Sequence, residues 1–269
     1  MKKIVYLLIV AGFLSVSCAS DDSATNAASG TSAYFPTTKG NYWVYKTKNS
    51  TTTGRDSLYT ANDTVISNTD YKKLKTKNAP TGFFAGTLNN NAVRNIGSKL
   101  ILTGNTSLSF SKDVPIAIAV TDFIFFDADV SPGLTIGYTA GTVKQDIDNG
   151  YTIDINYTLS ATSGEALSSY TVPNGKTYSN VKTANIKLNV SIIVFVDVLG
   201  TKIPFSVMKA QDVLVSTQYY SKNIGAVYVA TDINYTLNDL SSLKVTLPVA
   251  SSGSEHQDEI LDTYQVNAQ

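Results

Sequence analysis

Apolar residues recur at every second position over most of the chain after residue 33. Val, Ile, Tyr, Phe and Thr fill much of this pattern, and these side chains suit a pleated, half-buried strand. Helical spacing of apolar residues is nearly absent. Successive strands are predicted at residues 41–48, 55–61, 71–76, 82–88 and 99–102, with clusters of Asn, Gly, Ser and Thr between them. The pattern therefore predicts an all-β domain.

Two Asn-Gly pairs, at residues 149–150 and 174–175, each lie between alternating runs. Asn-Gly is typical of a two-residue hairpin turn in which both residues take positive φ. We therefore expect antiparallel hairpins to be the building unit of the domain.

Two segments depart from alternation, because residues 114–126 and 190–199 are apolar at nearly every position. Such strands are expected to be covered on both faces. Two interpretations stay open. One is a closed or sandwiched sheet with something packed against its outer face, and the other is an internal apolar cavity.

Short patterns occur twice in the chain, in the same order. Residues 65–76 share the spacing of Val, Tyr, Lys and Thr with residues 172–183, and Asn-Ile-Gly at 95–97 recurs at 223–225. Duplication of a half-domain would produce these matches. Chance would also produce them, because β-strands are built from few residue types. Both explanations stay open.

The N-terminus has the order of a secretory signal: two lysines, an apolar stretch over residues 4–16, and small residues directly before Cys18. The apolar stretch is too short to span a bilayer comfortably. Cys18 is the only cysteine, and it stands where a lipobox needs its acceptor thiol. We therefore expect cleavage before Cys18 and lipidation of its thiol.

These observations divide the chain into four parts. We expect a signal peptide at residues 1–17, a lipidated flexible tether at 18–33, a single β domain at 34–250 and a polar C-terminal tail at 251–269. The tether is expected because residues 20–32 are mainly Ser, Ala, Thr, Gly and Asp, which bury too little apolar surface to fold.

The residues that follow Cys18 are Ala19, Ser20, Asp21 and Asp22. This stretch resembles the export signal of Bacteroidota-type surface lipoproteins, which is Ser- and Asp-rich and lies just after the lipidated cysteine. The resemblance implies that Ser20, Asp21 and Asp22 direct the protein to the outer membrane and the cell surface. The alternative is an ordinary solvated tether with the domain on the periplasmic face.

Two further motifs are aromatic and glycine patterns: YFPxxxGNxW at residues 34–43 and NIGxV at residues 223–227. They resemble a family of largely uncharacterised envelope lipoproteins. The resemblance implies a strongly curved antiparallel sheet, similar to the open barrels of LolA-type lipoprotein carriers. We expect Gly40 and Gly225 at turns or bulges, and Trp43 and Tyr45 on one strand face within the core.

Charge and residue types exclude several functions. The 21 Lys and Arg balance the 21 Asp and Glu, so no basic field favours a nucleic-acid partner. The lack of a second cysteine excludes intrachain disulfides and Cys-based zinc sites. The single histidine, His256, falls in the expected tail, so we assign no catalytic residue, metal site or cofactor.

Carboxylates are the remaining candidates for catalysis, because two of them across a cleft suffice to hydrolyse a glycosidic bond. The candidate pairs are Asp127 with Asp129, and Asp146 with Asp148 or Asp154. Residues two apart on a strand share a face, so each pair has the spacing to converge. The favoured alternative is that these residues cap turns or carry solvated charge beside a hairpin.

We therefore predict a non-enzymatic envelope lipoprotein that binds an apolar ligand in its curved sheet, a glycan on its aromatic rim, or an envelope protein. The glycan would stack on tyrosines such as Tyr59, Tyr71, Tyr178 and Tyr228. These residues are equally well explained as strand-forming residues whose polar tips lie at the sheet boundary. A carboxylate-dependent glycan hydrolase and a structural or adhesion subunit are the alternatives.

Overall fold

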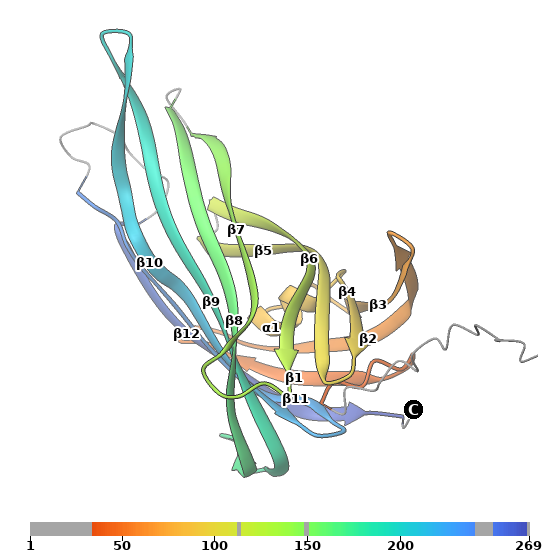
Figure 1. The fold of residues 1–269 in the computed structure, drawn as a ribbon. Helices are drawn as coiled ribbons and strands as arrows, with labels where there is room; N and C mark the ends of the chain where they lie inside the picture. Colours follow the sequence, from red (N-terminus) through yellow and green to blue (C-terminus); the bar gives the residue numbers. More distant parts are fainter. Residues whose placement is uncertain (1–33, 112–113, 148–150, 240–249, 268–269) are drawn as a thin grey trace, which may run out of the picture.

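The computed structural model describes residues 34–111, 114–147, 151–239 and 250–267, which form one curled antiparallel sheet with one short helix inside it (Figure 1). In chain order the elements are β1 (Tyr42–Lys48), β2 (Thr53–Ile66), β3 (Thr69–Thr76), α1 (Phe83–Leu88), β4 (Ala92–Ile96), β5 (Lys99–Ser111), β6 (Val114–Asp127), β7 (Thr135–Ile147), β8 (Tyr151–Thr171), β9 (Thr177–Val198), β10 (Thr201–Ser221), β11 (Gly225–Thr236) and β12 (Ser252–Gln265).

Strands that are neighbours in the sequence pair with each other, apart from β6 and β7. β12 pairs with β1, and β6 and β7 share no ladder, so the order is β6-β5-β4-β3-β2-β1-β12-β11-β10-β9-β8-β7. The two edge strands nevertheless contact each other, and β6 also contacts β8 and β9. The sheet is therefore a nearly closed barrel with one unsealed seam, which confirms the all-β, strongly curved antiparallel fold predicted from the sequence.

The repeated patterns fall at equivalent places in two six-strand halves. Residues 65–76 span the end of β2 and all of β3, whereas 172–183 follow β8 and begin β9. Asn-Ile-Gly lies at the β4–β5 connection in one half and at the β10–β11 connection in the other. The shift is six strands in every case, as a duplicated half-domain would predict.

The early motif at residues 34–43 and the late motif at residues 223–227 contact each other. Trp43 Nε1 donates to the Ile224 carbonyl oxygen over 2.5 Å, and Phe35 stacks on Trp43 with ring centroids 4.7 Å apart. Gly225 has φ +122°, and a Cβ there would lie 2.7 Å from Trp43 Nε1. Gly225 therefore also lies where the chain approaches Trp43 closely, and the full burial of Trp43 confirms that it belongs to the core.

The hairpins are confirmed, although their turns differ from expectation. β8 and β9 form a hairpin around residues 172–176, in which Gly175 has φ +85° while Asn174 does not have positive φ. β7 and β8 also pair as neighbours, and the Asn-Gly pair at 149–150 lies outside the described residues. The β9–β10 turn has positive φ at both Leu199 (+55°) and Gly200 (+84°), which is the geometry that Asn-Gly usually supplies.

The expectation that residues 190–199 are covered on both faces is wrong. Val190, Ile192 and Val194 are buried inside the sheet, whereas Ile193 is only half-buried on its outer face and Leu199 is fully exposed. β9 therefore alternates like any half-buried strand, and the apolar residues of its outer face are only partly covered.

The apolar segment in β6 likewise alternates for much of its described length, since Ile118 and Val120 are buried while Ala119 is exposed. Phe125 and Phe126 are both buried because the ladder with β5 shifts register between Leu100 and Ile101. A β-bulge of this kind lets consecutive side chains point into the core.

The segment 82–88 was expected to be a strand, and most of it is the helix α1 instead. Phe84 and Leu88 lie four residues apart and are both fully buried, so they occupy one face of the helix turn. The segment is too short for its periodicity to separate a strand from a helix, and partners far away in the sequence decide between them.

The polar C-terminal tail expected at 251–269 is also wrong, because residues 252–265 form β12 between β1 and β11. Its inward face carries Glu259 and Leu261, which are both buried. An inward polar residue interrupts the apolar alternation, and this interruption hid the strand from a pattern-based prediction.

Candidate binding site inside the barrel

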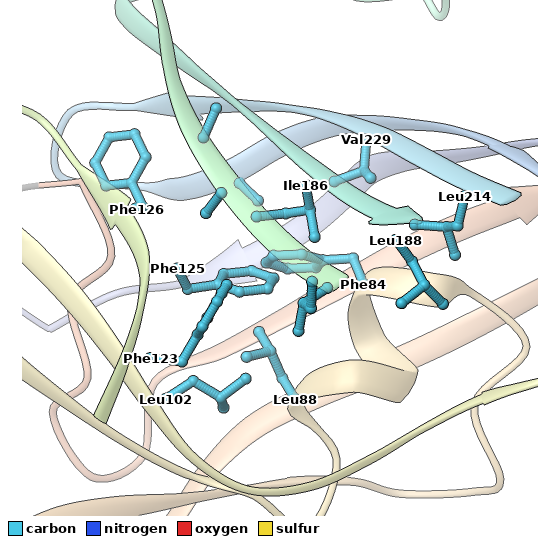
Figure 2. Packing of buried hydrophobic residues seen from close by; sticks show 14 of the residues in the cluster. Phe84, Leu88, Leu102, Phe123, Phe125, Phe126, Ile186, Leu188, Leu214 and Val229 are labelled. Atoms are coloured by element: carbon cyan, nitrogen blue, oxygen red, sulfur yellow. The ribbon is translucent and has the colours of Figure 1, made fainter. Parts of the chain in front are cut away.

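Helix α1 lies inside the curled sheet and is surrounded by aromatic and aliphatic side chains (Figure 2). Its second residue, Phe84, is fully buried. The Phe84 ring contacts the rings of Tyr45, Phe35, Tyr220 and Phe125, with centroids 5.7 to 6.3 Å apart. The helix therefore serves as part of the core rather than as a surface element.

The segment before α1 is held by the buried carboxylate of Asp56 on β2. Asp56 accepts hydrogen bonds from the backbone N–H of Thr81 at 2.9 Å and from that of Gly82 at 2.7 Å. The Thr81 hydroxyl donates to the same carboxylate at 3.1 Å. One side chain of the barrel wall thus fixes where the helix begins.

Two side chains of β12 satisfy the next three N–H groups. Gln257 Oε1 accepts from Phe83 N at 2.7 Å, while the carboxyl of Glu259 accepts from Phe84 N at 2.5 Å and from Ala85 N at 3.2 Å. The first N–H groups of a helix have no partner within the helix itself, so Asp56, Gln257 and Glu259 replace the usual N-cap side chain.

Position 82 requires glycine because the Glu259 side chain lies very close to its backbone. Its φ of −88° is ordinary, but a Cβ on Gly82 would lie 2.1 Å from Glu259 Oε2. Any side chain at position 82 would therefore push the Glu259 carboxyl away from the helix. The glycine is thus needed for its lack of volume.

Burial raises the pKa of the Glu259 carboxyl from 4.5 to about 8. The N–H groups of Phe84 and Ala85 oppose this shift, and the negative charge of Asp56 adds to it. No Lys or Arg within the described ranges forms an ion pair with either carboxylate. At neutral pH the Glu259 carboxyl is therefore mostly protonated.

A small pocket lies between α1 and the strands on both sides of the β6–β7 seam. Its lining consists of Phe83, Thr87, Leu102, Phe123, Phe125, Leu159 and Ile186. The free space is comparable to about one water molecule. The wall is apolar apart from Thr87.

The Thr87 hydroxyl has no hydrogen-bond partner in the structure, although the residue is only 6% exposed. Leaving a buried hydroxyl unpaired costs about 1–3 kcal/mol. Thr87 is the one polar residue of the lining, but its hydroxyl exposes no surface to the pocket.

The candidate carboxylate pairs do not meet at this pocket. Asp127 Oδ1 accepts from Ser98 Oγ at 2.6 Å and from Asp129 N at 3.1 Å, so Asp127 caps a turn as the alternative interpretation expected. On the β7–β8 hairpin, Asp146 accepts from Thr152 and Asp154 pairs with Lys144, at 2.8 and 3.5 Å. Asp148 lies outside the described residues.

Of the four candidate sugar-stacking tyrosines, Tyr228 and Tyr71 contact other side chains of the protein, and Tyr178 is buried in the core. Tyr228 stacks with Tyr170 at a centroid distance of 6.2 Å and makes a tilted contact with Tyr219 at 5.4 Å, and its hydroxyl donates to Asp258. Tyr71 is buried under Arg94, whose guanidinium lies 5.3 Å from the ring centroid. These rings form part of the packed wall. Tyr59 is partly exposed on β2.

His256 lies on the outer face of β12, between two carboxylates. Its Nδ1 is 2.7 Å from Asp232 Oδ1, and its Nε2 is 3.2 Å from Asp258 Oδ1. The hydrogen bond with Asp232 is the main cause that raises the pKa of His256. Within the part of the chain that the structure describes, no three His, Cys, Asp or Glu side chains are arranged to hold a metal ion.

Sequence reasoning missed four polar residues at α1, namely Thr87 within the helix and Asp56, Gln257 and Glu259 around its N-terminus. The sequence contained a signal for two of them. Asp56 lies two residues before Leu58, and Glu259 two residues before Leu261, so each shares the inward strand face with a buried leucine. The predicted lipidation and export residues, Cys18, Ser20, Asp21 and Asp22, lie outside the described residues. No described helix is long and apolar enough to cross a membrane.

Comparison with known proteins yields one similar structure. No family model matches the chain, and no curated protein matches it. A “putative lipoprotein” from Parabacteroides distasonis aligns with 86% of this chain and 98% of its own, at 14% identity and a TM-score of 0.37. A similarity of this size does not constrain the function of the chain.

Proposed function

We propose that this protein is a non-enzymatic envelope lipoprotein that binds an apolar molecule inside its barrel, beside α1. The observation that carries the proposal is the apolar pocket beside α1, which lies next to the unsealed β6–β7 seam. An apolar molecule that enters there would enlarge this space and contact its apolar wall.

Two features of the barrel favour entry of such a molecule. The seam between β6 and β7 has no ladder of backbone hydrogen bonds, so these edges separate without breaking a sheet. The side chains beside the seam, Phe123 and Leu159, are apolar and belong to the pocket wall. The pocket must enlarge to take a chain of several carbons, and the six-residue helix α1 is the wall element without a ladder to hold it.

A fluorescent polyene fatty acid tests the proposal. We expect saturable binding to the parent protein, and we expect Ile186→Phe to weaken binding at least tenfold because the larger ring fills the pocket. The matched control is Ile203→Phe, which makes the same change at a partly exposed position outside the pocket wall. Equal affinity in both variants, or no binding to the parent, would remove the proposal.

The lipid anchor is proposed from the sequence of residues 1–18. Cys18→Ala removes the acceptor thiol, so the mature protein is expected to leave the membrane fraction and to lose incorporated fatty acid. Fractionation of host cells labelled with a radioactive fatty acid measures both. The anchor is refuted if parent and variant label and fractionate alike.

Display on the cell surface is proposed from Ser20, Asp21 and Asp22. Replacing both Asp residues with Ala is expected to retain the lipid anchor but to leave the domain inside the outer membrane. Protease added to intact cells should then degrade the parent and spare the variant. Equal degradation of the two proteins would contradict an export role for these residues.

A further inference from the structure

The zero net charge of the chain is the sum of two unequal parts. Residues 34–111, which span β1 to β5, contain ten Lys and Arg and three Asp, so their net charge is +7. One of these three acids, Asp56, is buried inside the barrel. The other described ranges, 114–147, 151–239 and 250–267, contain seven Lys and fourteen Asp and Glu, so their net charge is −7. Positive charge is therefore concentrated on one part of the barrel.

The cations of β1 to β4 lie on the outer face of these four neighbouring strands (Figure 1). On β1 the alternating residues Trp43 and Tyr45 are fully buried, so Lys46 and Lys48 point outward. Lys46 is also the direct cross-strand partner of Arg55 on β2. The same alternation applies to β3 and β4. The basic face consists of Lys46, Lys48, Arg55, Lys73, Lys75 and Arg94, and none of them is buried.

Few acids neutralise the basic face. Asp262 of β12 pairs with Lys46 at 3.0 Å and with Arg55 at 2.7 Å. Arg94 pairs with Asp122 at 3.1 Å. The other three cations form no ion pair within the described part of the chain: Lys48, Lys73 and Lys75. Cations without partners that share one surface give it a positive potential, which attracts anions.

The chain enters the barrel beside the basic face. The carbonyl oxygen of Phe35 accepts from Asn95 of β4 at 3.0 Å, so the segment before β1 lies against that strand. Residues 19–33 join Tyr34 to the proposed lipid on Cys18, and this distance is at most about 55 Å even when the chain is fully extended. The anchor is therefore attached to the domain on its basic side.

We propose that the basic face docks the domain onto the phosphate headgroups of the membrane that holds the lipid anchor. Clusters of about four to eight Lys and Arg beside a membrane anchor are typical of binding to anionic lipids. The choice of a membrane as the occupant rests on the proposed lipid anchor, whereas the attraction for anions follows from the charges of the face itself. Docking would hold the barrel against the bilayer in one orientation.

Vesicle sedimentation tests the docking. The protein begins at residue 18 and contains Cys18→Ala, so it has no lipid and its binding reports the folded chain alone. We expect binding to vesicles of equal parts phosphatidylcholine and phosphatidylglycerol, falling steeply with added salt, and no binding to phosphatidylcholine alone. Lys73→Gln together with Lys75→Gln should weaken binding about 25-fold, because each lysine near an anionic surface contributes about fivefold.

Two further variants separate a local face from the overall charge. Lys202→Gln together with Lys209→Gln removes two exposed lysines of β10, outside the basic face, and should leave the affinity nearly unchanged. Asp262→Asn releases Lys46 and Arg55 from their shared acid, so it should strengthen binding about fivefold. A gain of this kind does not arise from misfolding.

Three results would overturn the docking: equal losses in the two double variants, no gain in Asp262→Asn, or equal binding to neutral and anionic vesicles. A lack of binding to the anionic vesicles would overturn it as well, whichever other polyanion the face attracts. Failure of fatty-acid labelling at Cys18 would refute the anchor, and failure of the polyene probe would refute the apolar pocket. Both of these results are distinct from the outcome of the vesicle measurement, in which no lipid anchor takes part.

Discussion

Replacing Phe84 with Ala is expected to lower the free energy of unfolding by about 3–5 kcal/mol, because it removes a fully buried ring and leaves a cavity behind. The Phe84 ring contacts four other aromatic rings, which come from strands on different sides of the barrel and from the segment before β1. Its loss therefore weakens packing around the whole interior. Urea denaturation followed by tyrosine and tryptophan fluorescence measures the change.

The neighbouring residue Phe83 is the matched control for this prediction. Phe83 is only partly buried and borders the pocket, so Phe83→Ala should cost clearly less than Phe84→Ala. The same substitution at two successive helix positions holds helix propensity and chain length constant. Equal costs at both positions would show that α1 does not lie in the barrel as the structure has it.

The second large effect is a loss of stability as pH rises. The pKa of Glu259 is about 8 in the folded protein and 4.5 in its ordinary state, so between these values the folded chain holds a proton that the unfolded chain has lost. This contribution to stability is complete below about pH 4.5 and is lost as pH rises through 8. The free energy of unfolding is expected to fall by up to about 1.4 kcal/mol per pH unit over this range and to level off above it.

Glu259→Gln isolates this contribution from other titrating groups, such as His256. The difference in the free energy of unfolding between variant and parent should grow in favour of the variant from pH 5 to pH 9, by several kcal/mol. Urea titrations at four pH values on both proteins measure this difference. A difference that stays constant with pH would mean that Glu259 titrates like an exposed carboxyl.

Local patterns predicted the strands whose inward face is apolar. Trp43 and Tyr45 lie two apart on β1, and both are fully buried as their spacing predicted. Gly40 and Gly225 have φ of +91° and +122°, in agreement with the turn or bulge positions expected for them. These features depend on neighbours within a few residues, so the sequence contains enough information to predict them.

The residues around α1 were not predictable in this way, because their states depend on partners far away in the chain. Glu259 lies about 175 residues from the N–H groups it accepts, and Asp56 about 25 residues from its own. A polar residue in an inward position normally argues against a strand, so β12 appeared to be a tail. The same polar groups are what turned an apolar segment into a helix at residues 83–88.

The sequence by itself determined the all-β class, the hairpin connections and the core positions of β1, because strand periodicity and turn residues act over short distances. Only the tertiary structure decided the place of β12 between β1 and β11, the helix inside the barrel and the buried acids that hold it. Because β1 pairs with both β2 and β12, Asp56 and Glu259 lie on the two sides of β1, and there they provide the caps that residues 81–85 need.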